Sequence, residues 1–155
     1  MMEWVDQAVA ITAPFEGCEK KVGFMVQPYL DRLAKPNVWT RGYGRTYGIT
    51  SESPPITMDE AKAELGQGLT KYGLACLRVA PALATRPKCL AAVASRAWNC
   101  GIGAFKVSRL RTAINDGRWD DAVSLMLKPD TAGGVVYRGL IRRRVAESMM
   151  FKAGI

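Results

Sequence analysis

The sequence contains no histidine among its 155 residues. A Ser-His-Asp or Cys-His catalytic centre therefore cannot be built from this chain, and neither can a hydrolase whose metal is held by histidine. General acid and base chemistry must fall instead to carboxylates, lysine, tyrosine or cysteine. Any catalytic proton transfer is expected to use one of these side chains.

Metal-site and membrane signals are missing as well. The four cysteines form no Cys-x-x-Cys pair, so we expect neither a structural zinc nor any other metal or cofactor. A disulfide between Cys76 and Cys89 is open as an alternative, since they bracket a proline-containing connection, but four reduced thiols are preferred. No apolar run reaches about 18 residues, so no membrane span is expected. The apolar stretch 8–14 lacks preceding basic residues and does not resemble a signal peptide.

What the sequence has in excess is positive charge, with a formal net charge of +8. Such a surface favours an anionic partner, which could be nucleic acid, an acidic polysaccharide or a membrane face, or it serves only solubility. No helix-turn-helix or aromatic-basic strand motif accompanies the charge, so a nucleic-acid partner is not expected.

The N-terminal half predicts one helix, a strand region and a second helix. Apolar residues at positions 4, 8, 11 and 15 indicate a helix that ends near Glu16 and Gly17. Residues 22–50 are rich in Gly, Pro, Tyr, Thr and Val, which predicts short strands and turns, and 51–55 predict a loop. Thr57 and Glu60 have capping-box spacing, which predicts a helix from Met58 to about Val79.

The C-terminal half predicts further helices. Pro81 and Pro87 interrupt the chain, and a helix stopped by Gly101 should follow. A short helix from Ser108 should end at 115–117, another should end before Pro129, and a last helix should carry basic residues on one side and apolar residues on the other. The chain is therefore predicted to be a single, mainly helical α+β domain with a small strand region near its N-terminus.

Three polar residues are candidates for chemistry. Glu16 lies at the predicted end of a helix beside Pro14 and Phe15, and both the helix dipole and these apolar neighbours favour the protonated carboxyl of a general acid. Asp31 and Thr40 are predicted on adjacent strands, where they could hold a water molecule between them. An acid, a carboxylate and room for water are the equipment of glycoside hydrolysis. Taken singly, each also fits an ordinary surface, turn or strand residue.

The order of motifs is more specific than any one of them. The segments FEG, YLD, WTRGYGRT and ITMDEAKAEL are followed by AWNCGIGAFKVSRL, AINDGRWDDA and GLIRRRVAESMMF. This series closely resembles the phage-type lysozymes of glycoside hydrolase family 24, over about residues 11–151. The resemblance implies a lysozyme-like fold with an N-terminal lobe at about 11–57, a connecting helix at 58–79 and a helical C-terminal lobe at 80–155.

The resemblance also implies a reaction and a catalytic set. The reaction is hydrolysis of the β-1,4 bond between N-acetylmuramic acid and N-acetylglucosamine in peptidoglycan. Matching of motifs gives Glu16 the position of the general acid, Asp31 that of the second carboxylate and Thr40 that of the threonine beside it. Candidate substrate-binding residues are Tyr29, Gly44, Arg45, Trp98, Asn99 and Ser108. Trp98 could equally belong to the core, Asn99 could cap its helix, and Ser108 is expected to cap the next one.

The sequence departs from the family in two places. The stretches between Glu16 and Asp31 and before Trp39 are lengthened. Arg45 stands where the family's Gly-Tyr-Gly turn commonly ends in histidine. We expect Arg45 to pair with a carboxylate across the lobes, as that histidine tends to do, with contact to the anionic peptide stems of the substrate as the alternative.

Other functions fit the same pattern. A lytic transglycosylase needs the acid but no water-activating carboxylate, and a non-catalytic wall-binding or regulatory protein could use the same fold. Arg142, Arg143 and Arg144 could touch an anionic envelope surface, although a core-packing helix with a solvated basic face is preferred. The family reading implies a monomeric phage endolysin without stable membrane insertion. It would accumulate in the host cytoplasm and reach the wall with the help of a separate pore-forming protein.

Overall fold

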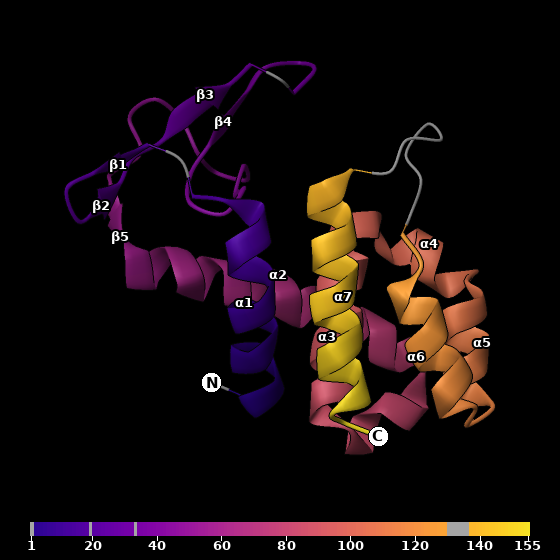
Figure 1. The fold of residues 1–155 in the computed structure, drawn as a ribbon. Helices are drawn as coiled ribbons and strands as arrows, with labels where there is room; N and C mark the ends of the chain where they lie inside the picture. Colours follow the sequence, from indigo (N-terminus) through magenta and orange to yellow (C-terminus); the bar gives the residue numbers. More distant parts are fainter. Residues whose placement is uncertain (1, 19, 33, 130–136) are drawn as a thin grey trace. The chain divides into compact units, whose positions relative to one another are not determined.

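The computed structural model describes residues 2–18, 20–32, 34–129 and 137–155. The chain divides into two compact units: one comprises residues 12–68, and the other comprises residues 1–11 and 69–155. Helices α1 (Glu3–Glu16) and α2 (Met58–Val79) each begin in one unit and end in the other (Figure 1). None of the helices in the described ranges is long and apolar enough to cross a membrane.

Two small antiparallel sheets form the strand region of unit 12–68. The first joins β1 (Lys21–Val22), β2 (Met25–Val26) and β5 (Ile56–Thr57) in that order. Val26 opposite Ile56 supplies its buried centre. The second is a hairpin of β3 (Tyr29–Asp31) and β4 (Val38–Thr40). The sequence predicted a single strand region, whereas the structure divides it because β2 pairs with a strand about thirty residues further along the chain.

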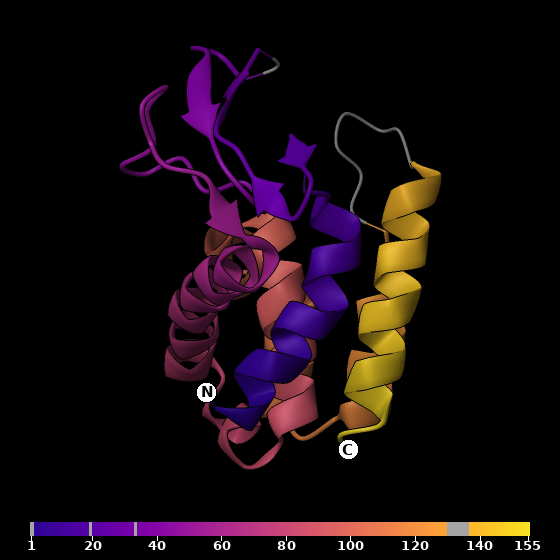
Figure 2. The ribbon, with the colours of Figure 1, turned by 90° about the vertical axis from the view of Figure 1, so that its left-hand side faces the viewer.

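The other unit is helical. Its elements are the 3₁₀ helix η1 (Pro81–Thr85) and the α-helices α3 (Pro87–Cys100), α4 (Ile102–Lys106), α5 (Arg109–Asn115), α6 (Trp119–Leu127) and α7 (Arg138–Lys152). Helix α7 packs against both α3 and α6, and α6 packs against α5 (Figures 1 and 2). The centre of the unit is filled by fully buried apolar side chains, among them Leu83, Val93, Ile114, Met126 and Phe151.

The predicted helix boundaries are confirmed where local signals set them. The capping box at the start of α2 is complete: the Thr57 amide donates to Glu60 Oε2 at 2.7 Å, and the Glu60 amide donates to Thr57 Oγ1 at 3.2 Å. Helix α3 ends before Gly101, whose φ of +85° suits glycine. The sequence missed η1 and α4, which are only five residues long and therefore show too little periodicity to detect.

The first helix buries the predicted apolar stripe. Trp4, Ala8 and Ile11 are all buried. The Trp4 ring of α1 lies directly against Gly73 of α2, where a Cβ would lie 2.2 Å from it. Only a glycine leaves room for the indole at this crossing, so the N-terminal turn of α1 is held by the helical unit.

The predicted solvated basic face of the last helix is wrong. Arg143 and Arg144 are 4% and 0% exposed, and both bind the carboxylate of the fully buried Glu147. Arg142 alone of the three arginines is exposed. Met149, expected on the apolar side, is 69% exposed. Two arginines and one glutamate of helix α7 therefore face the core, because a glutamate one turn further along can form an ion pair with both guanidinium groups.

None of the four cysteines, all of which lie in the described ranges, forms a disulfide, so the alternative of a disulfide between Cys76 and Cys89 is wrong. Both of these thiols are buried, whereas Cys18 and Cys100 are half-buried. Burial raises the pKa of Cys76 to about 12 and that of Cys89 to about 11, since the charged thiolate loses its hydration. The two buried thiols stay protonated at neutral pH and are therefore unreactive.

This difference predicts the result of thiol labelling. In the native protein at about pH 8, a disulfide reagent should modify Cys18 and Cys100 in preference to the two buried thiols, because only the thiolate reacts. Addition of denaturant should raise the number of modified thiols to four. Peptide mapping after labelling identifies the sites, and rapid native labelling of Cys76 or Cys89 would contradict the burial described here.

Candidate active site

Glu16 is the last residue of α1 and is half-buried. The helix stops there because Gly17 takes a φ of +66°, a conformation that glycine adopts without strain. The carboxyl group therefore lies at the negative end of the helix dipole, as the sequence predicted.

Asp31 and Thr40 lie on the two strands of the β3–β4 hairpin. Tyr29 pairs with Thr40, and Asp31 pairs with Val38. Paired residues project to the same side, and so do residues two apart on a strand, so Asp31 and Thr40 share one face of the hairpin. Diagonal neighbours of this kind lie about 7–8 Å apart, which leaves room for a water molecule between them. The predicted placement on adjacent strands is confirmed.

Each of the two side chains has a local anchor. Asp31 Oδ1 accepts a hydrogen bond from the Ala34 amide at 3.3 Å, a side-chain-to-backbone bond that spans three residues where the chain leaves β3. Thr40 is only 3% exposed, and its hydroxyl donates to the Val38 carbonyl at 3.4 Å. The long donor–acceptor distance marks that bond as weak. The hydroxyl is thus easily redirected to a stronger acceptor.

The Gly-Tyr-Gly turn follows Thr40 directly. Arg41 and Arg45 pair across it, with backbone hydrogen bonds of 2.9 and 3.0 Å that close the loop. Gly42 and Gly44 have φ angles of +62° and +90°, so glycine is needed at both. A Cβ at Gly42 would lie 3.3 Å from that of Ala61, which brings the turn close to helix α2.

One carboxylate holds both ends of this turn. Glu64 Oε1 lies 2.6 Å from Arg41 Nη2 and 3.2 Å from Arg45 Nη1. Arg41 is buried and also donates to the Pro54 carbonyl at 2.8 Å. The expectation that Arg45 pairs with a carboxylate is confirmed, but the expected pairing across the lobes is wrong, because Glu64 belongs to the same unit 12–68. Sequence reasoning missed Arg41 and Glu64; the available signal was a second arginine at the opposite end of the same glycine turn.

The ion pair of Arg45 and Glu64 predicts that the stability of the protein depends little on pH near neutrality. Because the chain has no histidine, its melting temperature should change little between about pH 6 and 7. An Arg45→His variant should lose stability as pH rises through that window, because Glu64 favours the protonated imidazole and its contribution is lost on deprotonation. The effect should stay below about 1 kcal/mol, since Arg45 is 38% exposed. Thermal melts of both proteins check this, and a steep slope in the parent would contradict it.

Three predicted binding residues belong to the helical unit. Trp98 is half-buried and packs edge-on against Tyr72, with 5.3 Å between ring centroids. Asn99 is not the helix cap, which is Gly101; its side-chain oxygen instead accepts from Arg144. Ser108 caps α5 as predicted, because its hydroxyl accepts from the Arg111 amide at 3.1 Å.

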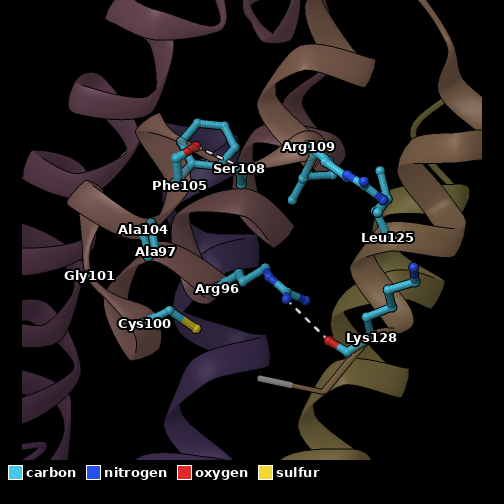
Figure 3. Close-up of a pocket in the computed structure, with 11 residues that line it drawn as sticks. Arg96, Ala97, Cys100, Gly101, Ala104, Phe105, Ser108, Arg109, Leu125 and Lys128 are labelled. Atoms are coloured by element: carbon cyan, nitrogen blue, oxygen red, sulfur yellow. Dashed lines mark hydrogen bonds between the residues drawn. The ribbon is translucent and has the colours of Figure 1, made fainter. Parts of the chain in front are cut away.

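Ser108 also lines a cavity of about 270 Å³ in this unit. Figure 3 shows Phe105 and Ala97 on its apolar side and Arg96, Arg109 and Lys128 toward its other side. The Arg96 guanidinium is engaged by the carbonyls at the end of α6, at 2.8 Å from Met126 O and 3.1 Å from Lys128 O. Arg96 is therefore a structural cap for α6.

The predicted site residues are thus divided between the two units. Residues 16, 29, 31, 40, 44 and 45 belong to unit 12–68, and residues 98, 99 and 108 belong to the helical unit. Within the first unit, the hairpin register brings Tyr29, Asp31 and Thr40 to one face. The binding roles of the individual residues stay predictions.

The sequence profile described as Phage lysozyme matches residues 15–147. The chain belongs to the phage lysozyme family. The match includes Glu16, Asp31 and Thr40, so all three predicted catalytic residues lie inside the segment that defines the family.

Individual proteins are similar to this chain in sequence or in fold. The endolysin of Bacillus phage PZA is 30% identical over 75% of this chain, which spans 45% of that relative's length. The muramidase domain of SpmX from Asticaccaulis excentricus has a TM-score of 0.73 at 27% identity, with 93% of each chain covered. The endolysin from Escherichia coli O157:H7 phage FAHEc1 has a TM-score of 0.75 over 99% of this chain and 96% of that one, at 24% identity. The predicted lysozyme-like α+β fold is confirmed for this phage lysozyme family member.

Proposed function

We propose that the protein is a phage endolysin of the muramidase type, which hydrolyses the β-1,4 bond between N-acetylmuramic acid and N-acetylglucosamine in peptidoglycan. Membership of the phage lysozyme family supports this assignment. The observation that carries it is the shared face of Asp31 and Thr40 in a unit whose first helix ends on Glu16. Together they supply an acid, a carboxylate and a hydroxyl without histidine.

Glu16 is the general acid in this proposal. Its protonated carboxyl donates to the glycosidic oxygen as the bond to the muramic acid carbon breaks, and the leaving sugar departs as a neutral alcohol. Gly17 lets the chain turn away at once and leaves the carboxyl at the helix end.

Asp31 and Thr40 act on the water. Asp31 accepts a proton from the attacking water or stabilises the positive charge that develops on the sugar ring. The Thr40 hydroxyl exchanges its weak bond to the Val38 carbonyl for one to that water and thereby orients it. The hairpin register fixes Asp31 and Thr40 relative to each other. The attacking water is therefore held in a reactive orientation before the glycosidic bond breaks, which lowers the entropic part of the barrier.

The biological setting follows from this activity. The enzyme acts as a monomer on peptidoglycan and causes host lysis. A separate pore-forming protein gives it access from the host cytoplasm to the wall. The net charge of +8 supports binding to an anionic wall polymer.

Product analysis tests the proposal. Purified peptidoglycan is digested with the protein, and the fragments are separated and identified by mass spectrometry. New reducing ends, with uptake of one water for each bond, are expected for hydrolysis. Fragments ending in 1,6-anhydromuramic acid would assign a lytic transglycosylase instead, and binding without any fragment would assign a wall-binding protein.

A further inference from the structure

A second feature of unit 12–68 is an open hollow beside Asp31. It has a volume of about 560 Å³. Its lining includes two half-buried aromatic side chains, Tyr29 and Trp39, and two exposed cationic ones, Lys20 and Arg32. None of the catalytic steps described above uses either cation.

The two cations are available for a ligand. Within the described parts of the chain, neither Lys20 nor Arg32 forms a salt bridge. Lys20 has a φ of +54°, unusual for a residue other than glycine. Its carbonyl accepts from the Gln27 amide at 3.1 Å, which ties this backbone position to the far side of the β1–β2 hairpin. Lys20 therefore enters the hollow from a fixed point.

The chemistry of the hollow fits a sugar that carries an acidic group. Tyr29 and Trp39 both line the hollow, although the hairpin register projects them to opposite faces. Either ring offers aromatic surface against which the apolar face of a sugar ring can pack. An ammonium and a guanidinium group together favour carboxylate as the polar part of the ligand. A pocket with a mainly apolar lining and a small number of polar groups that point to one place is typical of a specific binding site.

We propose that this hollow binds the free carboxylates of the peptide stem of peptidoglycan, through Lys20 and Arg32. The inference rests on the proposed function and extends it to the substrate's peptide part. The N-acetylated sugars of the glycan are neutral, so the stem carries the strand's carboxylates. The stem is attached to muramic acid, the sugar whose bond is cleaved beside Asp31.

The two cations offset an electrostatic repulsion between the stem and Asp31. A stem carboxylate that approaches the Asp31 carboxylate is repelled by it, and the repulsion grows as water is displaced. Lys20 and Arg32 line the same hollow as Asp31, so they offset this repulsion and make an anionic stem favourable. Lys20 lies in the lengthened stretch between Glu16 and Asp31, so the subsite is built in part from a segment that departs from the common family pattern.

The test compares two substrates and two double variants. Purified peptidoglycan is used either with free stem carboxylates or after chemical conversion of those carboxylates to amides. Lys20→Gln/Arg32→Gln removes both cations from the hollow. Lys21→Gln/Lys35→Gln is the matched control, because it removes two exposed cations that are close in sequence but do not line the hollow. Initial rates give KM and kcat for each pair.

On free-carboxylate peptidoglycan, KM of the Lys20/Arg32 variant should rise about fivefold with kcat unchanged, and KM of the control should change much less. Amidation should raise the parent's KM similarly and have little further effect on the Lys20/Arg32 variant. The difference should shrink in high salt, which screens exposed charges.

The possible outcomes distinguish a failure of this inference from a failure of the proposed function. Equal KM values for both double variants, or a parent indifferent to amidation, would overturn the inference while product formation by the parent leaves the muramidase assignment intact. Loss of kcat rather than a rise in KM would also contradict it, since that result would place the cations in the chemical step. A parent that forms no product would refute the proposed function itself.

Discussion

Substitution of Glu16 by glutamine should lower kcat on peptidoglycan by roughly 10²- to 10⁴-fold, because an amide cannot supply the proton that the leaving sugar needs. The side chains are nearly equal in size, and Glu16 is half-buried at a helix end, so the fold should be retained. Release of reducing ends measures the rate, and circular dichroism checks the fold. Binding to intact peptidoglycan should survive, since the proposed role is confined to the reaction.

Controls on other residues sharpen this test. Glu52→Gln removes an exposed carboxylate from a loop of the same unit and should leave the rate unchanged. Asp31→Asn and Thr40→Ala should each slow hydrolysis. The effect of Asp31→Asn should be larger, because the carboxylate accepts a proton or stabilises positive charge on the sugar, whereas the hydroxyl only orients water. A Glu16→Gln protein that digests peptidoglycan at the parental rate would remove the central residue of the proposal.

The catalytic placements were predictable because each follows from local sequence. Apolar periodicity and Gly17 fix the end of α1, and therefore the position of Glu16. A hairpin between apolar segments places Asp31 and Thr40 on adjacent strands, and the alternation of side chains then gives them one face. None of these steps needs knowledge of distant contacts.

The support of the glycine turn was only half predictable. The family's pattern pointed to a carboxylate partner for Arg45, but nothing local identifies that partner as Glu64. Arg41 and Glu64 are separated by 23 positions, and their meeting depends on how the turn approaches Ala61 on α2. Pairing of this kind follows from packing between elements, which a single sequence does not encode in its periodicity.

The prediction of a solvated basic face on the last helix is wrong for a related reason. Charged residues in a row normally mark a solvated face, so three consecutive arginines favour exposure. Two of them are buried because Glu147 follows at i+4 from Arg143 and i+3 from Arg144, and because Ser95 on α3 accepts from Arg143 at 3.0 Å through its carbonyl. The spacing of Glu147 was visible in the sequence, but the partner on α3 was not.

This buried cluster gives the largest expected effect on stability. Substitution of Glu147 by glutamine removes the negative charge that Arg143 and Arg144 share, and leaves both guanidinium groups in an environment with little water. Breaking a buried ion pair by removal of one partner costs about 3–5 kcal/mol. For a chain of this length, that loss lowers the melting temperature by roughly 10 °C.

An exposed ion pair of the same spacing provides the control. Arg118 and Asp121 are also i,i+3, with 2.5 Å between Nη1 and Oδ2, but their side chains are 49% and 59% exposed. Asp121→Asn should therefore cost at most about 1 kcal/mol, because water solvates both charges once they separate. Equal melting temperatures for Glu147→Gln and Asp121→Asn would show that burial adds nothing at α7. A large difference would identify the shared carboxylate as the group that lets two arginines face the core.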